Sequence, residues 1–187
     1  MIGVLALQGA FAAHATMLDA CGATSIEVRT PTDLESVDAL VLPGGESTTM
    51  SMMLERSGLL EPLAGRLTDG MAVFGTCAGA ILLGSEILDG RPDQRCLSAL
   101  DVAVQRNGYG RQVDSFESDI EVRGLDGTLR AVFIRAPRIT RVGPEVDVLA
   151  TVDGDAVLVR RGPVMASTFH PELGDDSRLH QMFLSSL

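Results

Sequence analysis

The stretch Phe74-Gly75-Thr76-Cys77-Ala78-Gly79 stands between two apolar runs, Met71–Phe74 and Ala80–Leu83. The first run predicts a buried strand and the second an apolar helix. A nucleophile on such a sharp strand-to-helix turn sits in strained backbone and needs small neighbours for the turn to close. The helix dipole also favours the thiolate form of Cys77. The pattern is typical of a nucleophile elbow; the alternative is a buried structural cysteine in a glycine-rich turn.

Short apolar runs alternate with helical patterns through the first half of the chain, which favours a parallel sheet with both faces covered. The expected strands are Ile2–Leu7, Ser25–Arg29, Asp38–Leu42 and Met71–Phe74, and the expected helices are Ala12–Cys21, Ser47–Arg56, Leu59–Leu67 and Ala80–Leu83. Ligands bind such open sheets at the carboxyl ends of the strands. The loops after Leu7, Leu42 and Phe74 are therefore the candidate positions for a site.

The second half of the chain changes to short runs separated by turn residues. The expected strands are Leu100–Gln105, Ile120–Arg123, Ala131–Ile134, Val146–Val152, Ala156–Arg161 and Val164–Phe169, followed by a helix over Asp176–Leu184. Gly124–Gly127 and Asp153–Asp155 read as hairpin turns. We expect a three-layer α/β fold, flavodoxin-like, with a mainly parallel central sheet, helices on both faces and an antiparallel extension. Residues 1–187 are expected to form a single domain.

Composition and charge exclude several classes of protein. Acidic residues outnumber basic ones by 25 to 15, which gives a net charge of −10, and no basic stripe suited to nucleic acid is present. All the basic residues are arginine, so neither a Walker A loop nor a Schiff-base lysine is possible. The apolar runs are too short to span a membrane.

Cysteine spacing points to a reducing compartment. Cys21, Cys77 and Cys96 are irregularly spaced, which supports neither a disulfide framework nor a zinc site. We expect a cytoplasmic protein that needs no metal and no bound cofactor.

His170-Pro171-Glu172 supplies the partners that a cysteine nucleophile requires. Cysteine catalysis needs an imidazole within hydrogen-bond reach and a third group that orients it. His170 follows an apolar run, and the rigid Pro171 restrains the backbone before Glu172. His14 and His180 lie in predicted helices, and we expect both to be structural.

The loop Pro43-Gly44-Gly45-Glu46-Ser47 follows the third expected strand. Its two glycines allow close approach of a ligand to the backbone, and the N–H of Gly45 could join that of Ala78 in an oxyanion hole. Glu46 and Ser47 either cap the following helix only or also contact a substrate.

Together these segments resemble class I (triad) glutamine amidotransferases, and among them the family of glutaminase subunits of pyridoxal 5′-phosphate synthase. The elbow and His-Pro-Glu are shared by the whole superfamily. The match extends over Gly3–Gly9, Leu42–Met50, Phe74–Gly79, Arg106–Glu117, Val132–Pro137 and Phe169–Leu173. The segments specific to the narrower family are Gly44–Met50 (GGESTTM), Gly110–Glu117 (GRQVDSFE) and Phe133–Pro137 (FIRAP).

The resemblance implies a role for each matching residue. Cys77 would form a γ-glutamyl thioester with L-glutamine, and His170 and Glu172 would complete the triad. The substrate contacts implied are Gly45, Glu46, Ser47, Arg106, Ile134 and Arg135. Glutamate and ammonia would be the products. The ammonia would pass to a separate (β/α)₈ synthase subunit that makes pyridoxal 5′-phosphate.

Two other functions fit parts of the sequence. Another class I enzyme, such as the glutaminase of histidine biosynthesis, would share the triad but not the segments around Arg106 and Arg135. A redox sensor with a reactive cysteine would need neither His170 nor Glu172. Ammonia release from glutamine, with and without a synthase partner, separates these possibilities.

Overall fold

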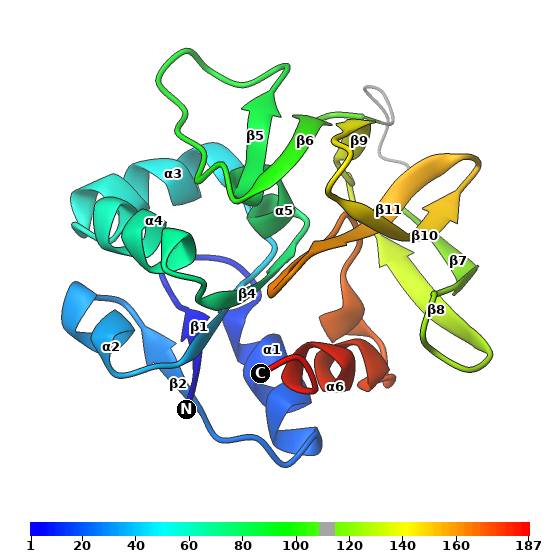
Figure 1. The fold of residues 1–187 in the computed structure, drawn as a ribbon, viewed down its shortest axis with the longest axis horizontal. Coiled ribbons are helices and arrows are strands. Elements are labelled where there is room, and N and C mark those ends of the chain that lie inside the picture. The colour runs from blue at the N-terminus through cyan, green and yellow to red at the C-terminus, as the bar shows by residue number, and fades with distance from the viewer. Residues whose placement is uncertain (109–114) are drawn as a thin grey trace.

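The computed structural model describes residues 1–108 and 115–187 and has an α/β architecture (Figure 1). Residues 109–114, within the quoted segment Arg106–Glu117, lie outside the described residues. The helices are α1 (Phe11–Ala20), α2 (Pro31–Glu35), α3 (Ser47–Arg56), α4 (Leu60–Thr68), α5 (Ala78–Leu83), the 3₁₀ turn η1 (Pro171–Leu173) and α6 (Arg178–Leu184). The strands are β1 (Ile2–Leu5), β2 (Ser25–Val28), β3 (Ala39–Leu42), β4 (Ala72–Thr76), β5 (Gly84–Ile87), β6 (Leu100–Gln105), β7 (Phe116–Glu121), β8 (Thr128–Phe133), β9 (Arg138–Val142), β10 (Asp147–Val152), β11 (Asp155–Arg161) and β12 (Val164–Ser167).

One large sheet organises the fold, with the strand order β2-β1-β3-β4-β12-β11-β9-β6-β5 and β10 paired to β11. Five neighbouring strands, β2, β1, β3, β4 and β12, are parallel to one another, whereas β11 pairs antiparallel with β12, β9 and β10. The predicted parallel sheet with an antiparallel extension is therefore confirmed.

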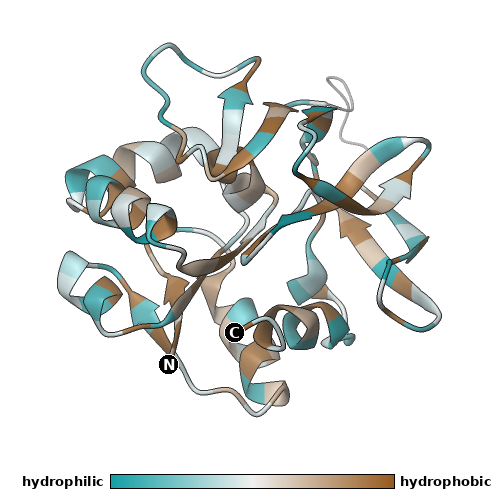
Figure 2. Cartoon of the chain, viewed as in Figure 1, coloured by the Kyte–Doolittle hydropathy of each residue, from teal (hydrophilic) through white to brown (hydrophobic). Residues whose placement is uncertain are grey.

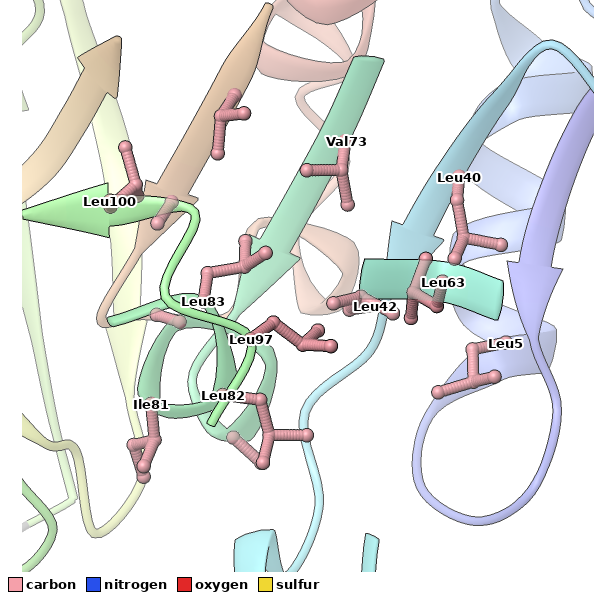
Figure 3. Close-up of a cluster of buried hydrophobic side chains, with 14 of the residues drawn as sticks. Leu5, Leu40, Leu42, Leu63, Val73, Ile81, Leu82, Leu83, Leu97 and Leu100 are labelled. Atoms are coloured by element: carbon pink, nitrogen blue, oxygen red, sulfur yellow. The ribbon is translucent and has the colours of Figure 1, made fainter. Parts of the chain in front are cut away.

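Successive side chains of the parallel strands point to opposite faces of the sheet and contribute to two hydrophobic cores, one on each face. Leu40 and Leu42 of β3 join a core with α3, α4 and α5, whereas Val41 joins a second core with α1 and α6. Figure 3 shows Leu40 and Leu42 within the first of these cores. In Figure 1, α1 and α6 lie together on the opposite side of the sheet from α3 and α4. Hydrophobic colour follows strands such as β1 and β11, whereas α3 and α4 carry hydrophilic stretches (Figure 2).

Several details differ from the sequence prediction. Val164–Phe169 was expected in the antiparallel part, but β12 runs parallel to β4 and belongs to the central sheet. The strands expected over Ile120–Arg123 and Ala131–Ile134 form a separate two-stranded sheet, β7 and β8, that packs on the second core. The sequence reading also lacked α2, β5 and β9.

No helix in residues 1–108 or 115–187 is long and apolar enough to cross a membrane.

Candidate active site

Cys77 occupies a strained position between β4 and α5. It has φ 48° and ψ −100°, a left-handed backbone conformation that non-glycine residues rarely adopt, and its N–H donates to the Ser167 carbonyl of β12 at 2.8 Å. A Cβ on Gly79 would lie 2.2 Å from the Leu42 carbonyl oxygen, so only glycine fits there. The elbow is thus held by close backbone contacts with β3 and β12.

His170 and Glu172 meet at the end of the neighbouring strand. Their side chains are buried, and His170 Nδ1 lies 2.7 Å from Glu172 Oε1. The His170 N–H donates to the Val132 carbonyl at 2.8 Å, which anchors the segment to β8. Since β4 and β12 are adjacent and parallel, their carboxyl ends bring Cys77 and His170 together.

Burial and hydrogen bonding compete in setting the charges of these groups. Burial disfavours the imidazolium, but hydrogen bonds with Cys77 and Glu172 outweigh it and raise the pKa of His170 to about 10. Burial likewise disfavours the carboxylate of Glu172, but the hydrogen bond from His170 holds its pKa below the ordinary value. The arrangement favours a charged imidazole between a thiol and a carboxylate.

Glu46 is the N-cap of α3, and its carboxylate also reaches the site. It accepts hydrogen bonds from the N–H groups of Thr48 and Thr49, and from Arg106 Nη2 at 2.9 Å. Partial burial disfavours its charge, but the bonds from Thr49 and Thr48 lower the pKa of Glu46 to about 2. Glu46 is therefore a fixed negative charge as well as a capping residue.

A cavity of about 230 Å³ joins these groups. Its lining includes all the predicted substrate contacts together with Cys77 and His170: Gly45, Glu46, Ser47, Arg106, Ile134 and Arg135. Arg135 has φ 44°, again in the left-handed region, and within the described residues its guanidinium makes no hydrogen bond or ion pair.

Two further residues line the cavity that sequence reasoning did not identify, Ile81 and Asn107. Ile81 lies one helical turn after Cys77, so its i+4 spacing was a usable signal. Asn107 adjoins Arg106, and its N–H donates to Asp89 at 3.1 Å. No spacing in the sequence relates Asn107 to Asp89.

The two predicted oxyanion donors have different surroundings. Ala78 is the first residue of α5, so its N–H has no acceptor within the helix. The Gly44 carbonyl accepts a hydrogen bond from the Ala10 N–H at 3.1 Å, which holds the Gly44–Gly45 peptide in one orientation. A Cβ on Gly45 would lie 1.7 Å from Gln8 Nε2, so this loop packs directly on the Gln8 side chain.

His14 and His180 are fully buried and hydrogen-bonded to each other, with His14 Nδ1 at 2.9 Å from His180 Nε2. No group of three or more metal-binding side chains with suitable geometry occurs in residues 1–108 and 115–187.

Known proteins resemble this chain over nearly its full length. The model of the SNO glutamine amidotransferase family matches residues 4–187. A protein of Mycobacteroides abscessus named pyridoxal 5′-phosphate synthase subunit PdxT is 54% identical over 98% of this chain and 95% of its own length. A protein of the same name from Nocardia farcinica is 56% identical over 98% of this chain and 84% of its own.

A solved structure gives the same result. The chain described as a glutamine amidotransferase superposes with a TM-score of 0.94 at 49% identity, and the match covers 99% of this chain and 97% of that one. The fold and the polypeptide length are therefore shared with this relative.

Proposed function

Because this chain belongs to the SNO glutamine amidotransferase family, we propose that it is the glutaminase subunit of a pyridoxal 5′-phosphate synthase. It hydrolyses L-glutamine to L-glutamate and ammonia, and the ammonia serves vitamin B6 synthesis. The assignment of residues rests on the buried arrangement of Cys77, His170 and Glu172. In it, the His170 side chain is hydrogen-bonded to both the Cys77 thiol and the Glu172 carboxylate.

Cys77 is the nucleophile of the proposed reaction. Its thiolate attacks the side-chain amide carbon of glutamine, and His170 donates its proton to the departing nitrogen as the carbon–nitrogen bond breaks. The products of this half are ammonia and a γ-glutamyl thioester. Water then attacks the thioester, His170 takes the water's proton, and the thiolate leaves as glutamate forms. Glu172 orients His170 throughout and keeps the imidazolium stable.

The tetrahedral oxyanion is stabilised by two backbone donors, the N–H groups of Gly45 and Ala78. The Ala78 N–H, which has no acceptor within α5, and the glycine turn after β3 support this assignment. Gly45 lines the cavity, Ala78 directly follows the cavity-lining Cys77, and the adjacent strands β3 and β4 lead into these two segments.

Recognition of glutamine depends on its two charges. Glu46 is ionised at neutral pH and suits the α-ammonium group, while Arg135, whose guanidinium has no partner among the described residues, suits the α-carboxylate. Ser47, Arg106 and the backbone of Ile134 complete the substrate contacts. The Arg106–Glu46 ion pair fixes the position of both side chains.

The partner is a synthase subunit, as the names of the relatives indicate. We assign it a (β/α)₈ barrel fold and propose that ammonia is channelled to it without release into solvent. The glutaminase itself needs no cofactor, metal, nucleic acid or membrane. Residues 1–187 act as one glutaminase domain in the cytoplasm, where a thiol nucleophile stays reduced.

The test is ammonia release from L-glutamine by the purified chain, alone and titrated with the synthase subunit from the same organism. We expect glutamate and ammonia in equal amounts, and pyridoxal 5′-phosphate formation when the synthase receives its sugar phosphates. Absence of ammonia release under both conditions would refute the assignment.

A further inference from the structure

Behind the triad, on the side away from Cys77, lies a second buried row of polar side chains. His14 on α1 is fully buried, and its Nε2 lies 3.4 Å from Glu172 Oε2 and 3.1 Å from Thr76 Oγ1. Its Nδ1 lies 2.9 Å from Nε2 of His180 on α6. The row therefore runs from Cys77 through His170 and Glu172 to the two histidines.

The outer oxygen of Glu172 needs a partner. Oε1 is occupied by His170, whereas Oε2 is buried and makes no hydrogen bond of standard geometry within the described residues. A buried carboxylate oxygen without a donor is costly, and a free carboxylate can rotate away from the imidazole. His14 Nε2 is the titratable nitrogen placed against this oxygen.

The tautomer of His14 follows from the surrounding groups. Burial lowers the pKa of His14 to about 4 and that of His180 to about 3, so both imidazoles are neutral and each carries one N–H. With the proton on His14 Nε2, that nitrogen faces the carboxylate as a donor, and Nδ1 accepts from His180 Nε2–H. The other tautomer would set a lone pair of His14 against the negative oxygen and leave a buried N–H on His180 Nδ1 unpaired.

We propose that His14 is a positioning residue for the glutaminase reaction, whose Nε2–H holds Glu172 Oε2 so that Oε1 stays aligned with His170. His180 supports it by donating to Nδ1, which fixes the required tautomer. In this tautomer Thr76 Oγ1, directly before the nucleophile, also accepts from His14 Nε2–H at 3.1 Å, which ties α1 to the elbow. The inference rests on the proposed function, and it assigns His14 and His180 a role beyond the structural one expected from the sequence.

The first arm of the test is kinetic and uses the full chain with its synthase subunit. His14→Met removes the donor at similar size, whereas His14→Gln keeps an amide nitrogen at about the reach of imidazole Nε2. We expect His14→Met to lower kcat roughly 10-fold, because one hydrogen bond to a charged group is lost, with KM little changed. His14→Gln should recover most of this loss.

A double-mutant cycle distinguishes positioning from a general loss of stability. If His14 acts through Glu172, then adding His14→Met to Glu172→Gln should lower kcat no further. Leu18→Val, which trims a fully buried side chain one turn along α1, is the matched control and should lower the melting temperature but leave kcat unchanged. Losses that multiply in the double variant, or equal kcat losses in His14→Gln and His14→Met, would overturn the proposal.

Two further measurements keep the result decisive if His14→Met does not fold or if glutamine is not the substrate. His180→Met removes the donor to His14 Nδ1 and should give a smaller kcat loss that also vanishes in the Glu172→Gln background. Alkylation of Cys77 by iodoacetamide, followed by mass spectrometry with Cys21 and Cys96 as internal references, needs no substrate. The Cys77 rate profile should shift to higher pH in both methionine variants, and an unchanged profile would refute the positioning role. If the alkylation profile of Cys77 differs between the wild type and the variants as expected, but the wild type releases no ammonia, only the proposed glutaminase activity is refuted.

Discussion

His170 Nδ1 lies 2.7 Å from Glu172 Oε1 although only Pro171 separates the two residues. β12 ends at Ser167, and His170 (φ −106°, ψ 87°) directly precedes the 3₁₀ turn η1, which begins at Pro171. Both side chains are buried. This pair is made by local structure, whereas its contact with Cys77 depends on the parallel pairing of β12 with β4. The proposed triad therefore combines a local turn with a tertiary contact.

Cys77→Ala should abolish ammonia release, by roughly 10³-fold or more, because no other thiol lines the cavity among the described residues. It should also remove labelling by an electrophilic glutamine analogue, measured by intact mass. Cys21→Ala and Cys96→Ala are the controls, since both thiols lie outside the cavity lining. Labelling that follows Cys21 or Cys96 would contradict the assignment of the nucleophile.

The two partners of Cys77 should differ in importance. His170→Asn should be almost inactive, because the imidazole both receives and donates the transferred proton. Glu172→Gln should keep more activity, since it orients His170 without exchanging the proton itself. Steady-state kcat of each variant, in the presence of the synthase subunit, measures the difference. A wild-type rate in His170→Asn would rule out the mechanism.

The close contact between the elbow and β3 predicts a specific intolerance. In Gly79→Ala the new Cβ would stand 2.2 Å from the backbone oxygen of Leu42, so the backbone must shift. We expect a fall in melting temperature and a loss of activity, because the shift moves the start of α5. Gly65→Ala is a matched control in α4, where a Cβ meets no atom within 4 Å.

The control variant Gly65→Ala should change the stability in the opposite direction. An alanine in place of a helical glycine stabilises by about 0.5–1 kcal/mol, so Gly65→Ala should raise the melting temperature slightly and leave activity unchanged. Thermal denaturation followed by circular dichroism gives both results. Equal stability of Gly79→Ala and Gly65→Ala would show that the elbow tolerates the added carbon.

The sequence was most informative where function depends on local patterns. The helix Ser47–Arg56 has the predicted bounds, and the elbow was found because glycines on both sides of Cys77 are required sterically. The helix α2 was not predicted, although its start is visible in the sequence. Thr30 and Asp33 form a capping box, and Pro31 occupies the first turn. β9 gives a weak strand signal because two consecutive exposed polar residues, Thr140 and Arg141, interrupt the alternation of polar and apolar residues over Arg138–Val142.

Contacts between segments that are distant in the sequence could not be predicted from it. The position of β12 beside β4 decides which His and Cys meet, yet both strands read only as apolar runs. The approach of His14 to Glu172 depends on how α1 packs against η1, and a lone histidine in a helix gives no sign of its partner. Sequence patterns define elements and turns; the packing of the two cores sets the distances between them.

Acid should destabilise the protein before its carboxylates titrate. Burial lowers the pKa of His14 to about 4 and that of His180 to about 3, from an ordinary value of 6.5, so below pH 6.5 the unfolded chain binds protons that the folded chain does not. The free energy of unfolding therefore decreases as the pH is lowered through this window, by roughly 2 kcal/mol for each histidine between pH 7 and pH 5. His14 is faced by Glu172, His170 and His180, and the raised pKa of His170 already gives its full contribution below pH 6.5.

Urea midpoints at pH 7 and 5 measure this loss. His14→Gln and His180→Gln each remove one titrating group, so each variant should lose less stability over the window than the wild type. A wild-type midpoint that does not change between pH 7 and 5 would show that neither histidine is held neutral. Comparison above pH 5 avoids the titration of Glu46 and Glu172, whose pKa values are lowered.

The last prediction concerns the Gly44–Gly45 peptide, which carries one of the two proposed oxyanion donors. A glycine pair can hold this peptide in either of two orientations, and here the Ala10 N–H binds the Gly44 carbonyl at 3.1 Å while Gln8 packs against Gly45. Turning the peptide breaks that hydrogen bond, so residues 8–10 control which way the Gly45 N–H points.

We expect the isolated chain to hydrolyse glutamine slowly and to be activated by the synthase subunit. A partner that binds only the productive orientation shifts the population by at most its difference in affinity for the two states. Loss of one oxyanion donor costs about 10²–10³ in rate, so activation should not exceed roughly that factor. Steady-state glutamine hydrolysis, titrated with synthase subunit, measures it. A full rate in the free chain that does not change on titration would mean that both donors are already in place.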